Sequence, residues 1–490
     1  MSHLLAIDQS TSATKAVLFD FAGRAVDKAS REHQQIYPQP GWVEHDAEEI
    51  WRNVLGVICE IAGRGKFQEL AGLSIANQRE TIVVFERGSG RPLHNAIVWQ
   101  CRRGEPICSR LKAEGQDKLI RSKTGLMVDT YFSASKLAWL VREKPELRAK
   151  LKSGEALIGT IDCYLIYRLT GGKVFATDHT NASRTMLFDI EKLRWDEKLC
   201  ALFEVPMAAL PEVREPVARF GETDASGALA KPVPICGVMG DSQASLFAQH
   251  CYEPGTAKAT FGTGTSVLLN IGEKCRVTET GAVTALAWVV GGKPTYAFEG
   301  IINYSAATIA WLKEQLGLIP DASDAEAMAR AVSDNGGVYL IPAFVGLSAP
   351  YWSPNARAAI VGMTSFTKRE HIVRAALESI AYQIRDVLDM MRGDAGVALR
   401  ALHADGGPTR NEFLMQFTAD VAGVELRVSD VPESSALGAA MAGMIWLGVC
   451  KSLTELAALP REARSFQPHG DAAKVKQLHD GWLAAVRRVL

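Results

Sequence analysis

Residues 4–23 have the sequence LLAIDQSTSATKAVLFDFAG, which predicts two strands joined by a small polar turn. The first apolar run ends in an acid, Asp8, and the second follows a turn made of Ser and Thr residues. Residues 24–35, RAVDKASREHQQ, predict a third extended segment after the Ala22–Gly23 turn. The chain therefore begins with a hairpin followed by a third strand.

A similar arrangement recurs in the middle of the chain. Residues 233–241, VPICGVMGD, predict a strand that ends in Asp241, and residues 256–272 predict another hairpin around a Gly/Thr/Ser turn. Helical patterns lie between these segments, as at residues 46–64, which we expect Asp46 to cap. Alternating strands and helices predict an α/β protein. We read the recurrence as a weak internal duplication and place a domain boundary near residue 250, giving domains 1–250 and 251–490.

The composition is that of an ordinary soluble globular protein. The 490 residues are 47% hydrophobic and 22% charged, and the formal net charge is -1. This balance offers no bulk attraction for nucleic acid or for a membrane surface. The nine cysteines form no CxxC pair, and the first residues do not have the pattern of a signal peptide, so we expect a cytoplasmic location. The longest apolar stretch, residues 436–450, is too short for membrane insertion and predicts a buried helix.

Three turns have the small residues that let backbone N–H groups approach a phosphate. They are Asp8–Lys15, Phe261–Ser266 and Asp405–Asn411, the last before a predicted helix. Hydroxyls and Lys15 add donors in the first, and Asp8 could hold magnesium. Each would also serve as a plain polar turn or an ordinary strand-to-helix connection. The chain has no G-x-x-x-x-G-K-[ST] sequence, so a nucleotide site would be of another type.

Asp241 is the candidate general base, because activation of an alcohol needs a carboxylate within reach of its proton. The alternative reading is a helix N-cap, which also fits the end of a strand. Arg79 and Glu80 could bind neighbouring hydroxyls of a polyol, although a surface ion pair would give the same sequence. Trp99 and Tyr131 could form an apolar wall with a phenol donor, or simply be core aromatics.

Long blocks of the sequence resemble the FGGY family of carbohydrate kinases, and among them most resemble the members that phosphorylate glycerol. The resemblance covers nearly the whole chain. Its main blocks are WVEHD (42–46), NQRET (77–81), NAIVWQCRR (95–103), YFSASKLAW (131–139), TDHTNASRTMLFDI (177–190), NGGVYLIPAFVGLSAPYW (335–352), ALESIAYQIRDVL (376–388) and SALGAA (435–440).

The resemblance implies a two-domain fold like those of actin and hexokinase (ribonuclease H-like), with ATP and Mg²⁺ in an interdomain cleft. It implies transfer of phosphate to a terminal hydroxyl of a small polyol, with glycerol, giving sn-glycerol 3-phosphate, as the leading substrate. It also leads us to expect a homo-oligomer, either a dimer or a tetramer. Carried over by position, the implied roles are catalysis by Asp241, metal binding by Asp8 and Asp241, nucleotide binding by Thr11, Ser12, Lys15, Thr263, Gly407 and Asn411, and polyol binding by Arg79, Glu80, Trp99, Tyr131, Asp241, Ser242 and Ser266.

Departures from the family pattern keep other hypotheses open. Ser242 and Ser266 stand where the glycerol-phosphorylating members usually have Gln and Phe, and both changes shrink side chains at the polyol. A larger polyol or ketose, such as erythritol, threitol, a pentitol or a pentulose, is therefore the alternative substrate. Near the adenine, Ala306 and Ala310 occupy positions where the glycerol-phosphorylating members tend to have Gly and Gln. Lys15 replaces an arginine of the family. A non-catalytic sugar sensor is the third hypothesis, since a fold alone does not give activity.

Overall fold

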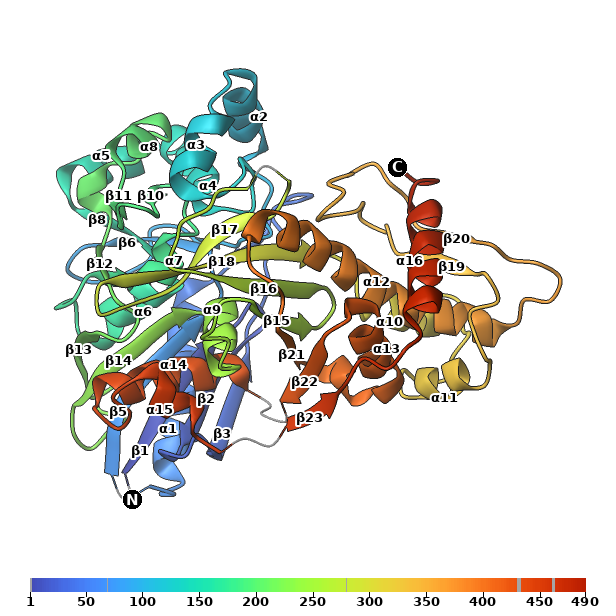
Figure 1. The fold of residues 1–490 in the computed structure, drawn as a ribbon. Coiled ribbons are helices and arrows are strands. Elements are labelled where there is room, and N and C mark those ends of the chain that lie inside the picture. The colour runs from blue at the N-terminus through green and yellow to red at the C-terminus, as the bar shows by residue number, and fades with distance from the viewer. Residues whose placement is uncertain (1, 68, 279, 430–432, 461–462) are drawn as a thin grey trace.

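A computed structural model describes residues 2–67, 69–278, 280–429, 433–460 and 463–490. Two mixed β-sheets organise the chain (Figure 1). The first has the order β13 (Arg219–Thr223), β14 (Val233–Gly240), β5 (Glu69–Asn77), β1 (Ser2–Gln9), β2 (Ala13–Phe19), β3 (Ala25–Glu32). The second has the order β17 (Val283–Val290), β18 (Lys293–Ile302), β16 (Thr265–Gly272), β15 (Thr256–Phe261), β21 (Ala401–Asp405), β22 (Glu425–Ser429), β23 (Ala463–Phe466). The predicted α/β fold is confirmed.

Both predicted hairpins are present and occupy matching places in the two sheets. β1 pairs antiparallel with β2 and parallel with β5, and β15 pairs antiparallel with β16 and parallel with β21. The strand that ends before Asp241, β14, is parallel to β5 in the first sheet. By sheet order it therefore corresponds to β22 in the second sheet. The carboxyl ends of β1, β5 and β14 thus meet at one edge, which brings Asp8, Arg79 and Asp241 to the same side.

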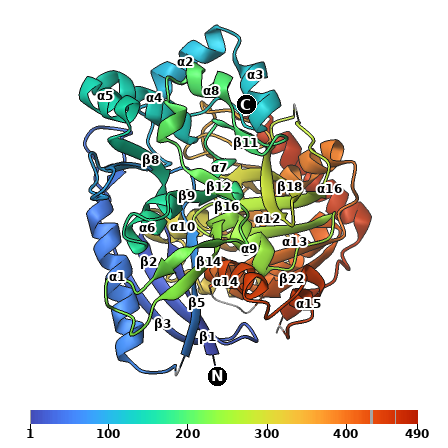
Figure 2. The same ribbon diagram turned by 90° about the vertical axis from the view of Figure 1, so that its left-hand side faces the viewer.

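The first sheet is covered on both faces, which explains its apolar strands. Alternate residues of β1 face opposite sides: Leu5 and Ile7 pack with α1 (Ala47–Gly63) and α6 (Ile161–Leu169). Leu4 and Ala6 pack with α9 (Asp241–Ala248) and α14 (Ser434–Trp446). As predicted, Asp46 caps α1, accepting from the Glu48 N–H at 2.9 Å. Figure 2 shows α1 on the outer side of this sheet.

Helix α14 comes from the second half of the chain but packs on the first sheet. Its residues from Ala436 to Met444 are buried, as expected for a core helix. None of the helices that the structure describes has both the length and the apolar character needed to span a bilayer. The chain therefore returns to the first sheet after completing most of the second. The division into domains 1–250 and 251–490 remains a prediction.

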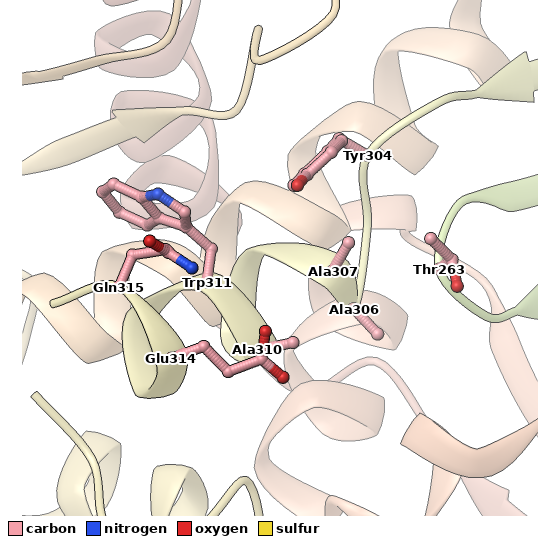
Figure 3. A pocket seen from close by; sticks show the side chains of 8 residues that line it. All are labelled: Thr263, Tyr304, Ala306, Ala307, Ala310, Trp311, Glu314 and Gln315. Atoms are coloured by element: carbon pink, nitrogen blue, oxygen red, sulfur yellow. The ribbon is translucent and has the colours of Figure 1, made fainter. Parts of the chain in front are cut away.

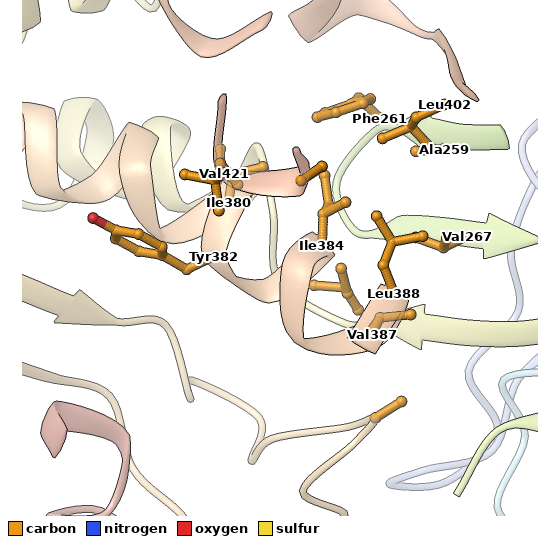
Figure 4. Packing of buried hydrophobic residues seen from close by; sticks show 14 of the residues in the cluster. Ala259, Phe261, Val267, Ile380, Tyr382, Ile384, Val387, Leu388, Leu402 and Val421 are labelled. Carbon is orange, nitrogen blue, oxygen red and sulfur yellow. The ribbon is translucent and has the colours of Figure 1, made fainter. Parts of the chain in front are cut away.

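The second sheet packs against the long helix α12 (Arg369–Ala395). Figure 4 shows Ile384, Val387 and Leu388 of this helix beside Val267 and other strand residues. The C-terminal helix α16 (Ala472–Val486) packs on the same body through Trp482, whose ring stacks on Tyr382. Ala485 and Val486 of this helix belong to the same hydrophobic cluster as Trp482.

The remaining elements are smaller. A four-stranded sheet has the order β4 (Glu44–His45), β7 (Ala96–Ile97), β6 (Ile82–Glu86), β8 (Ala156–Thr160). Short pairs are β9 (Ala176–Asp178) with β12 (Glu212–Arg214), β10 (Phe188–Asp189) with β11 (Arg194–Trp195), and β19 (Tyr339–Ile341) with β20 (Ala359–Val361). The other helices are α2 (Glu105–Ala113), α3 (Asp117–Thr124), α4 (Ser133–Glu143), α5 (Pro145–Ser153), α7 (His179–Ala182), α8 (Glu197–Leu202), α10 (Ala307–Glu314), α11 (Asp324–Arg330), α13 (Glu412–Ala422) and α15 (Leu453–Ala457), with 3₁₀ turns η1 (Met207–Ala209) and η2 (Gly407–Arg410).

Candidate active site

The first polar turn joins β1 to β2 and is held from two sides. The indole Nε1–H of Trp99 donates to Thr11 Oγ1 at 2.9 Å. The Nε2 atom of His33 lies 2.9 Å from the Thr11 carbonyl oxygen. Ser12, the neighbouring predicted phosphate ligand, is exposed in the same turn. The predicted polyol wall and the predicted phosphate turn are therefore in direct contact.

Lys15 is bound to a carboxylate that the sequence did not single out. Its Nζ lies 2.8 Å from Oε2 of Glu433, and Lys28 lies 2.9 Å from Oε1 of the same group. Burial alone would lower the pKa of Lys15, but the hydrogen bond to Glu433 and the charges of Asp8 and Glu433 raise it. Lys15 is thus a fixed cation beside the first turn.

Asp8 lies opposite Lys15 in the β1–β2 register and is buried. Burial raises its pKa to about 7; Lys15 opposes the rise, while Asp241 and Glu433 add to it. Two carboxylates, those of Asp8 and Asp241, are therefore close enough to repel one another. A hard divalent cation bound by one or two carboxylates and substrate phosphates fits this donor set.

Asp241 is the first residue of α9, and the N-cap position falls on Gly240. The N-cap reading of Asp241 is therefore wrong by one residue. The Gly240 N–H donates to Thr180 Oγ1 at 2.8 Å, which fixes the backbone before the acid. Asp241 Oδ1 accepts from the Ser242 N–H at 2.6 Å and lies 3.2 Å from Arg79 Nε. The side chain is still 37% exposed, so the carboxylate is oriented yet accessible.

Arg79 and Glu80 are buried, so the surface ion-pair reading is wrong. They follow β5, and Glu80 has a φ of 62°, a left-handed conformation that few non-glycine residues adopt. The Ser133 hydroxyl donates to the Glu80 carbonyl oxygen at 2.9 Å and stabilises this turn. A strained, hydrogen-bonded backbone of this kind occurs where side-chain direction matters.

Trp99 and Tyr131 form the predicted aromatic pair, with ring centroids 5.2 Å apart. Both side chains are only partly buried, unlike aromatics of the core. Burial and the nearby Glu80 carboxylate raise the pKa of Tyr131 well above its usual range, so its phenol stays protonated and can donate. The guanidinium of Arg184 lies 6.0 Å from its ring centroid.

The two serines that depart from the family pattern lie on different elements. Ser242 is half-buried in the first turn of α9. Ser266 on β16 is paired with Ile301 of β18, as Leu268 is with Glu299. Because residues two apart on a strand share a face, Ser266 and Glu299 lie on the same face of the sheet. The Ser266 hydroxyl oxygen is buried and has no hydrogen-bond partner in the structure.

Thr263, in the second predicted phosphate turn, lines a pocket of about 580 Å³. Figure 3 shows Tyr304 and Trp311 on its walls, with Ala306, Ala307 and Ala310 of the α10 region below them in the view. Glu314 and Gln315 complete the lining. The turn itself is fixed by backbone bonds, since the Ser305 N–H donates to the Thr263 carbonyl oxygen at 2.8 Å. Aromatic walls with a few polar groups suit a planar heterocycle.

The third predicted turn lies beside the second, because β15 and β21 are parallel neighbours. A Cβ at Gly406, whose φ is 101°, would lie 1.9 Å from the Phe261 carbonyl oxygen, so only glycine fits. Gly407 begins the 3₁₀ turn, and the space around its Cα is open. Asn411 caps α13, accepting from the Leu414 N–H at 2.8 Å. Asn411 therefore has a structural role at the predicted nucleotide side.

Comparison with known proteins identifies the chain. The N-terminal domain model of the FGGY family of carbohydrate kinases matches residues 3–248, and the C-terminal domain model matches residues 257–447. The chain belongs to the FGGY family of carbohydrate kinases. The resemblance predicted from the sequence is confirmed, and with it the class of enzyme, a phosphotransferase with an alcohol acceptor.

Several relatives of this FGGY kinase are similar over their full length. A glycerol kinase of Carboxydothermus hydrogenoformans is 47% identical over 99% of this chain and 98% of the relative. A glycerol kinase of Shewanella sp. (strain ANA-3) is also 47% identical, over 99% of both chains. A crystal structure of Plasmodium falciparum glycerol kinase with ADP has a TM-score of 0.95 and 38% identity, covering 100% of this chain and 98% of that one. The predicted actin/hexokinase-like fold class is confirmed.

Besides Glu433, two charged residues of this FGGY kinase were missed in the sequence analysis. Arg184 and Glu299 are fully buried and contact the Arg79–Glu80 pair. Burial opposes ionisation of Glu299, yet the charges of Arg184 and Arg79 hold its pKa at about 2. A signal was present: Glu299 is an acid inside the apolar strand YAFEGII, and a charge there needs a buried partner.

Proposed function

We propose that the chain transfers the γ-phosphoryl group of ATP to a terminal hydroxyl of glycerol, giving sn-glycerol 3-phosphate and ADP. The observation that carries the proposal is the placement of Asp241. Its carboxylate is exposed on one side and is held by Arg79 and by the Ser242 N–H on the other. Its neighbours are Asp8 and the buried Arg79–Glu80 pair, which are chemically suited to magnesium and to hydroxyl groups.

In the proposed reaction Asp241 accepts the proton of the hydroxyl whose oxygen attacks the γ-phosphorus. The bond to the β–γ bridging oxygen breaks, and ADP leaves with that electron pair. Arg79 donates to the remaining hydroxyls and Glu80 accepts from them. Trp99 and Tyr131 cover the carbon face, and the Tyr131 phenol supplies a donor. Binding energy from these groups orients the reacting hydroxyl toward Asp241.

For the nucleotide, we propose that the base occupies the Thr263–Trp311 pocket and that the phosphates extend toward Thr11, Ser12 and Lys15. Gly407 and Asn411 would border the adenosine from the third turn. Asp8, with Asp241, would hold Mg²⁺, which neutralises charge on the phosphates when bound. The ADP of the Plasmodium relative supports a nucleotide site on this fold.

The test is an ATP-consumption screen of the purified chain against glycerol, erythritol, threitol, pentitols and pentuloses. We expect the highest kcat/KM for glycerol. A tenfold higher kcat/KM for a longer polyol or a pentulose would show that this compound, and not glycerol, is the substrate, while the kinase activity would stand. If none of these compounds stimulates ATP consumption, the proposal is contradicted and a non-catalytic sugar sensor is favoured.

A larger polyol or ketose is the second candidate, and one observation favours it. The Ser266 hydroxyl is buried and has no hydrogen-bond partner among the described residues, and it lies on the face of the sheet that carries Glu299. An unpaired buried hydroxyl is costly, and a further substrate hydroxyl would satisfy it. Ser266→Phe should then shift kcat/KM toward glycerol, by about 10- to 200-fold, as 1–3 kcal/mol of apolar contact implies. An unchanged ratio would remove this candidate.

Other sequence predictions are retained as parts of the proposal. The chain works in the cytoplasm and forms a dimer or a tetramer. Both substrates bind in a cleft between domains 1–250 and 251–490. Size-exclusion chromatography with light scattering measures the number of chains in the assembly directly. A monomer at micromolar concentration would contradict it.

A further inference from the structure

Glu299 brings one negative charge from the second sheet into the group of charges contributed by the first half of the chain. Its Oε1 lies 2.7 Å from Arg79 Nη2, and its Oε2 lies 3.3 Å from Arg79 Nη1 and 2.7 Å from Arg184 Nη1. The carboxylate is thus bound by two guanidinium groups at once. It is almost completely buried, in the middle of β18.

The two arginines continue the chain of contacts to Glu80. Arg184 Nε donates to Glu80 Oε1 at 2.7 Å, and Arg79 Nε lies 3.9 Å from the same oxygen. Four residues therefore close a ring in which positive and negative charges alternate: Arg79, Glu299, Arg184 and Glu80. Both of these contacts of Glu80 use Oε1, which leaves Oε2 for a hydroxyl.

The ring has a charge balance that bears on Asp241. Its two positive and two negative charges cancel, and two further charges face it. They are Asp241, whose Oδ1 lies 3.2 Å from Arg79 Nε, and the buried Lys258 of β15, whose charge acts on Glu299 and Asp241. Without Glu299, the charged partners left to Arg79 and Arg184 among the described residues would be Glu80 and Asp241. Arg79 Nη1 would keep Gln243 Oε1 as a partner, at 3.1 Å, but Nη2 would lose its carboxylate. The guanidinium could then turn further toward Asp241 and cover its carboxylate.

We propose that Glu299 is a positioning residue: it fixes Arg79 directly and Glu80 through Arg184 in the orientation that a polyol requires. This rests on the proposed function, since Arg79 and Glu80 are its polyol ligands. Because Glu299 lies on the second sheet while the other three residues lie in the first half of the chain, the polyol site is complete only when the two halves are correctly placed against one another.

A purely structural ring predicts a different result. Buried ion pairs contribute little net stability compared with apolar residues of the same volume, but removing one partner strongly destabilises a protein. A structural role would therefore lower stability and all kinetic constants together. A positioning role changes polyol recognition while leaving nucleotide recognition in place.

The test compares Glu299→Gln and Glu299→Asp with a matched control, Glu378→Gln. Glu378 is equally buried and lies 2.8 Å from Arg374 Nε, but it is on α12 away from the ring. For each variant we measure KM for glycerol and for ATP, kcat, and the rise in melting temperature that each substrate causes. Should Glu299→Gln fail to fold, Glu299→Asp retains the charge with a shorter reach and gives the same comparison.

We expect Glu299→Gln to lower kcat/KM for glycerol at least 100-fold, with KM for ATP changed less than threefold. Its melting temperature should rise with ATP but not with glycerol. Glu299→Asp should have a kcat/KM for glycerol at least tenfold higher than that of Glu299→Gln. Glu378→Gln should keep the wild-type ratio of KM for glycerol to KM for ATP. Wild-type glycerol kinetics in Glu299→Gln, or equal loss for both substrates, would overturn the proposal.

The outcome is separate from that of the proposed function. If the wild-type chain prefers a longer polyol, the same measurements are made with that polyol and the expected ratios are unchanged. If the wild-type chain neither binds nor phosphorylates any compound of the screen, both proposals fail. A wild type that phosphorylates glycerol beside a Glu299→Gln variant that does so equally well overturns only the role of Glu299.

Discussion

The two strand–turn–strand units, β1–β2 and β15–β16, have the same sheet position but different surroundings. Side chains hold the first turn: Trp99 on Thr11, and Glu433 on Lys15. Backbone bonds fix the second turn, among them one from the Ser305 N–H, and the turn opens on the pocket lined by Tyr304 and Trp311. The turn in the first half thus lies among fixed charges and hydrogen-bond donors, whereas the turn in the second half borders a pocket with aromatic walls. Activity should therefore respond to the change of single polar atoms on the side of the first turn, and to side-chain volume on the side of the pocket.

The strongest test of the charged side is Asp241→Asn, which keeps shape and removes the base. We expect kcat to fall by about 10²–10⁴-fold, the usual contribution of a general base. Binding of ATP, measured by calorimetry, should change little, because the nucleotide pocket belongs to the other half. Undiminished turnover would show that Asp241 is not the base.

Buried charge on the polyol side should also make stability depend on pH through Lys136. Its Nζ donates to the carbonyl oxygens of residues 130, 131 and 132, at 2.5, 2.8 and 2.9 Å, and burial lowers its pKa to about 8. Between about pH 8 and 10.5 the unfolded chain keeps this proton while the folded chain loses it, so the free energy of unfolding rises with pH, by up to ~1.4 kcal/mol per unit.

Chemical unfolding of the wild type and of Lys136→Met from pH 7 to 10 measures this contribution. Only the wild type should gain stability from this group over the range, so the difference between the two curves should grow with pH. Parallel curves would mean that Lys136 stays protonated in the folded chain.

On the nucleotide side, volume should matter more than charge. Ala310→Trp places a large side chain in the pocket of about 580 Å³. KM for ATP should rise at least tenfold while KM for the polyol changes little. The matched control is Ala331→Trp, the same change on an exposed alanine at the end of α11. Equal effects of the two substitutions would contradict the assignment of the pocket.

The smallest effect should come from the link between the polyol wall and the phosphate turn. Trp99→Phe removes the bond to Thr11 Oγ1, and a neutral hydrogen bond contributes about 1 kcal/mol, so kcat/KM should fall about fivefold. Thr11→Val should have a similar effect, and the double variant should cost no more than either single one. Additive losses in this double-mutant cycle would show that the bond does not couple the two residues.

The sequence was sufficient for the fold class because apolar strands bounded by small polar turns, and a capped helix, are local patterns. β1, β2 and α1 follow the expected boundaries closely. The roles of Asp8, Asp241, Arg79 and Glu80 came from chemistry at strand ends, together with the family resemblance. Their burial could not be predicted, because it depends on residues far away in the chain.

Glu299, Arg184 and Glu433 illustrate what local patterns miss. Glu299 lies 220 residues from Arg79, and Glu433 lies 418 residues from Lys15. A lone buried charge in the sequence indicates that some partner exists but not which one. The partner is set by how two sheets and a returning helix are packed, which no short window contains.

The return of α14 to the first sheet has a consequence for synthesis on the ribosome. Residues 2–32 build one edge of that sheet, but the helix that covers β1, β5 and β14 ends only at Trp446. During translation the sheet keeps an uncovered apolar face until nearly the whole chain has emerged. Such late, long-range closure slows folding and leaves a period open to aggregation. Fragments ending before residue 434 should therefore need chaperones to remain in solution.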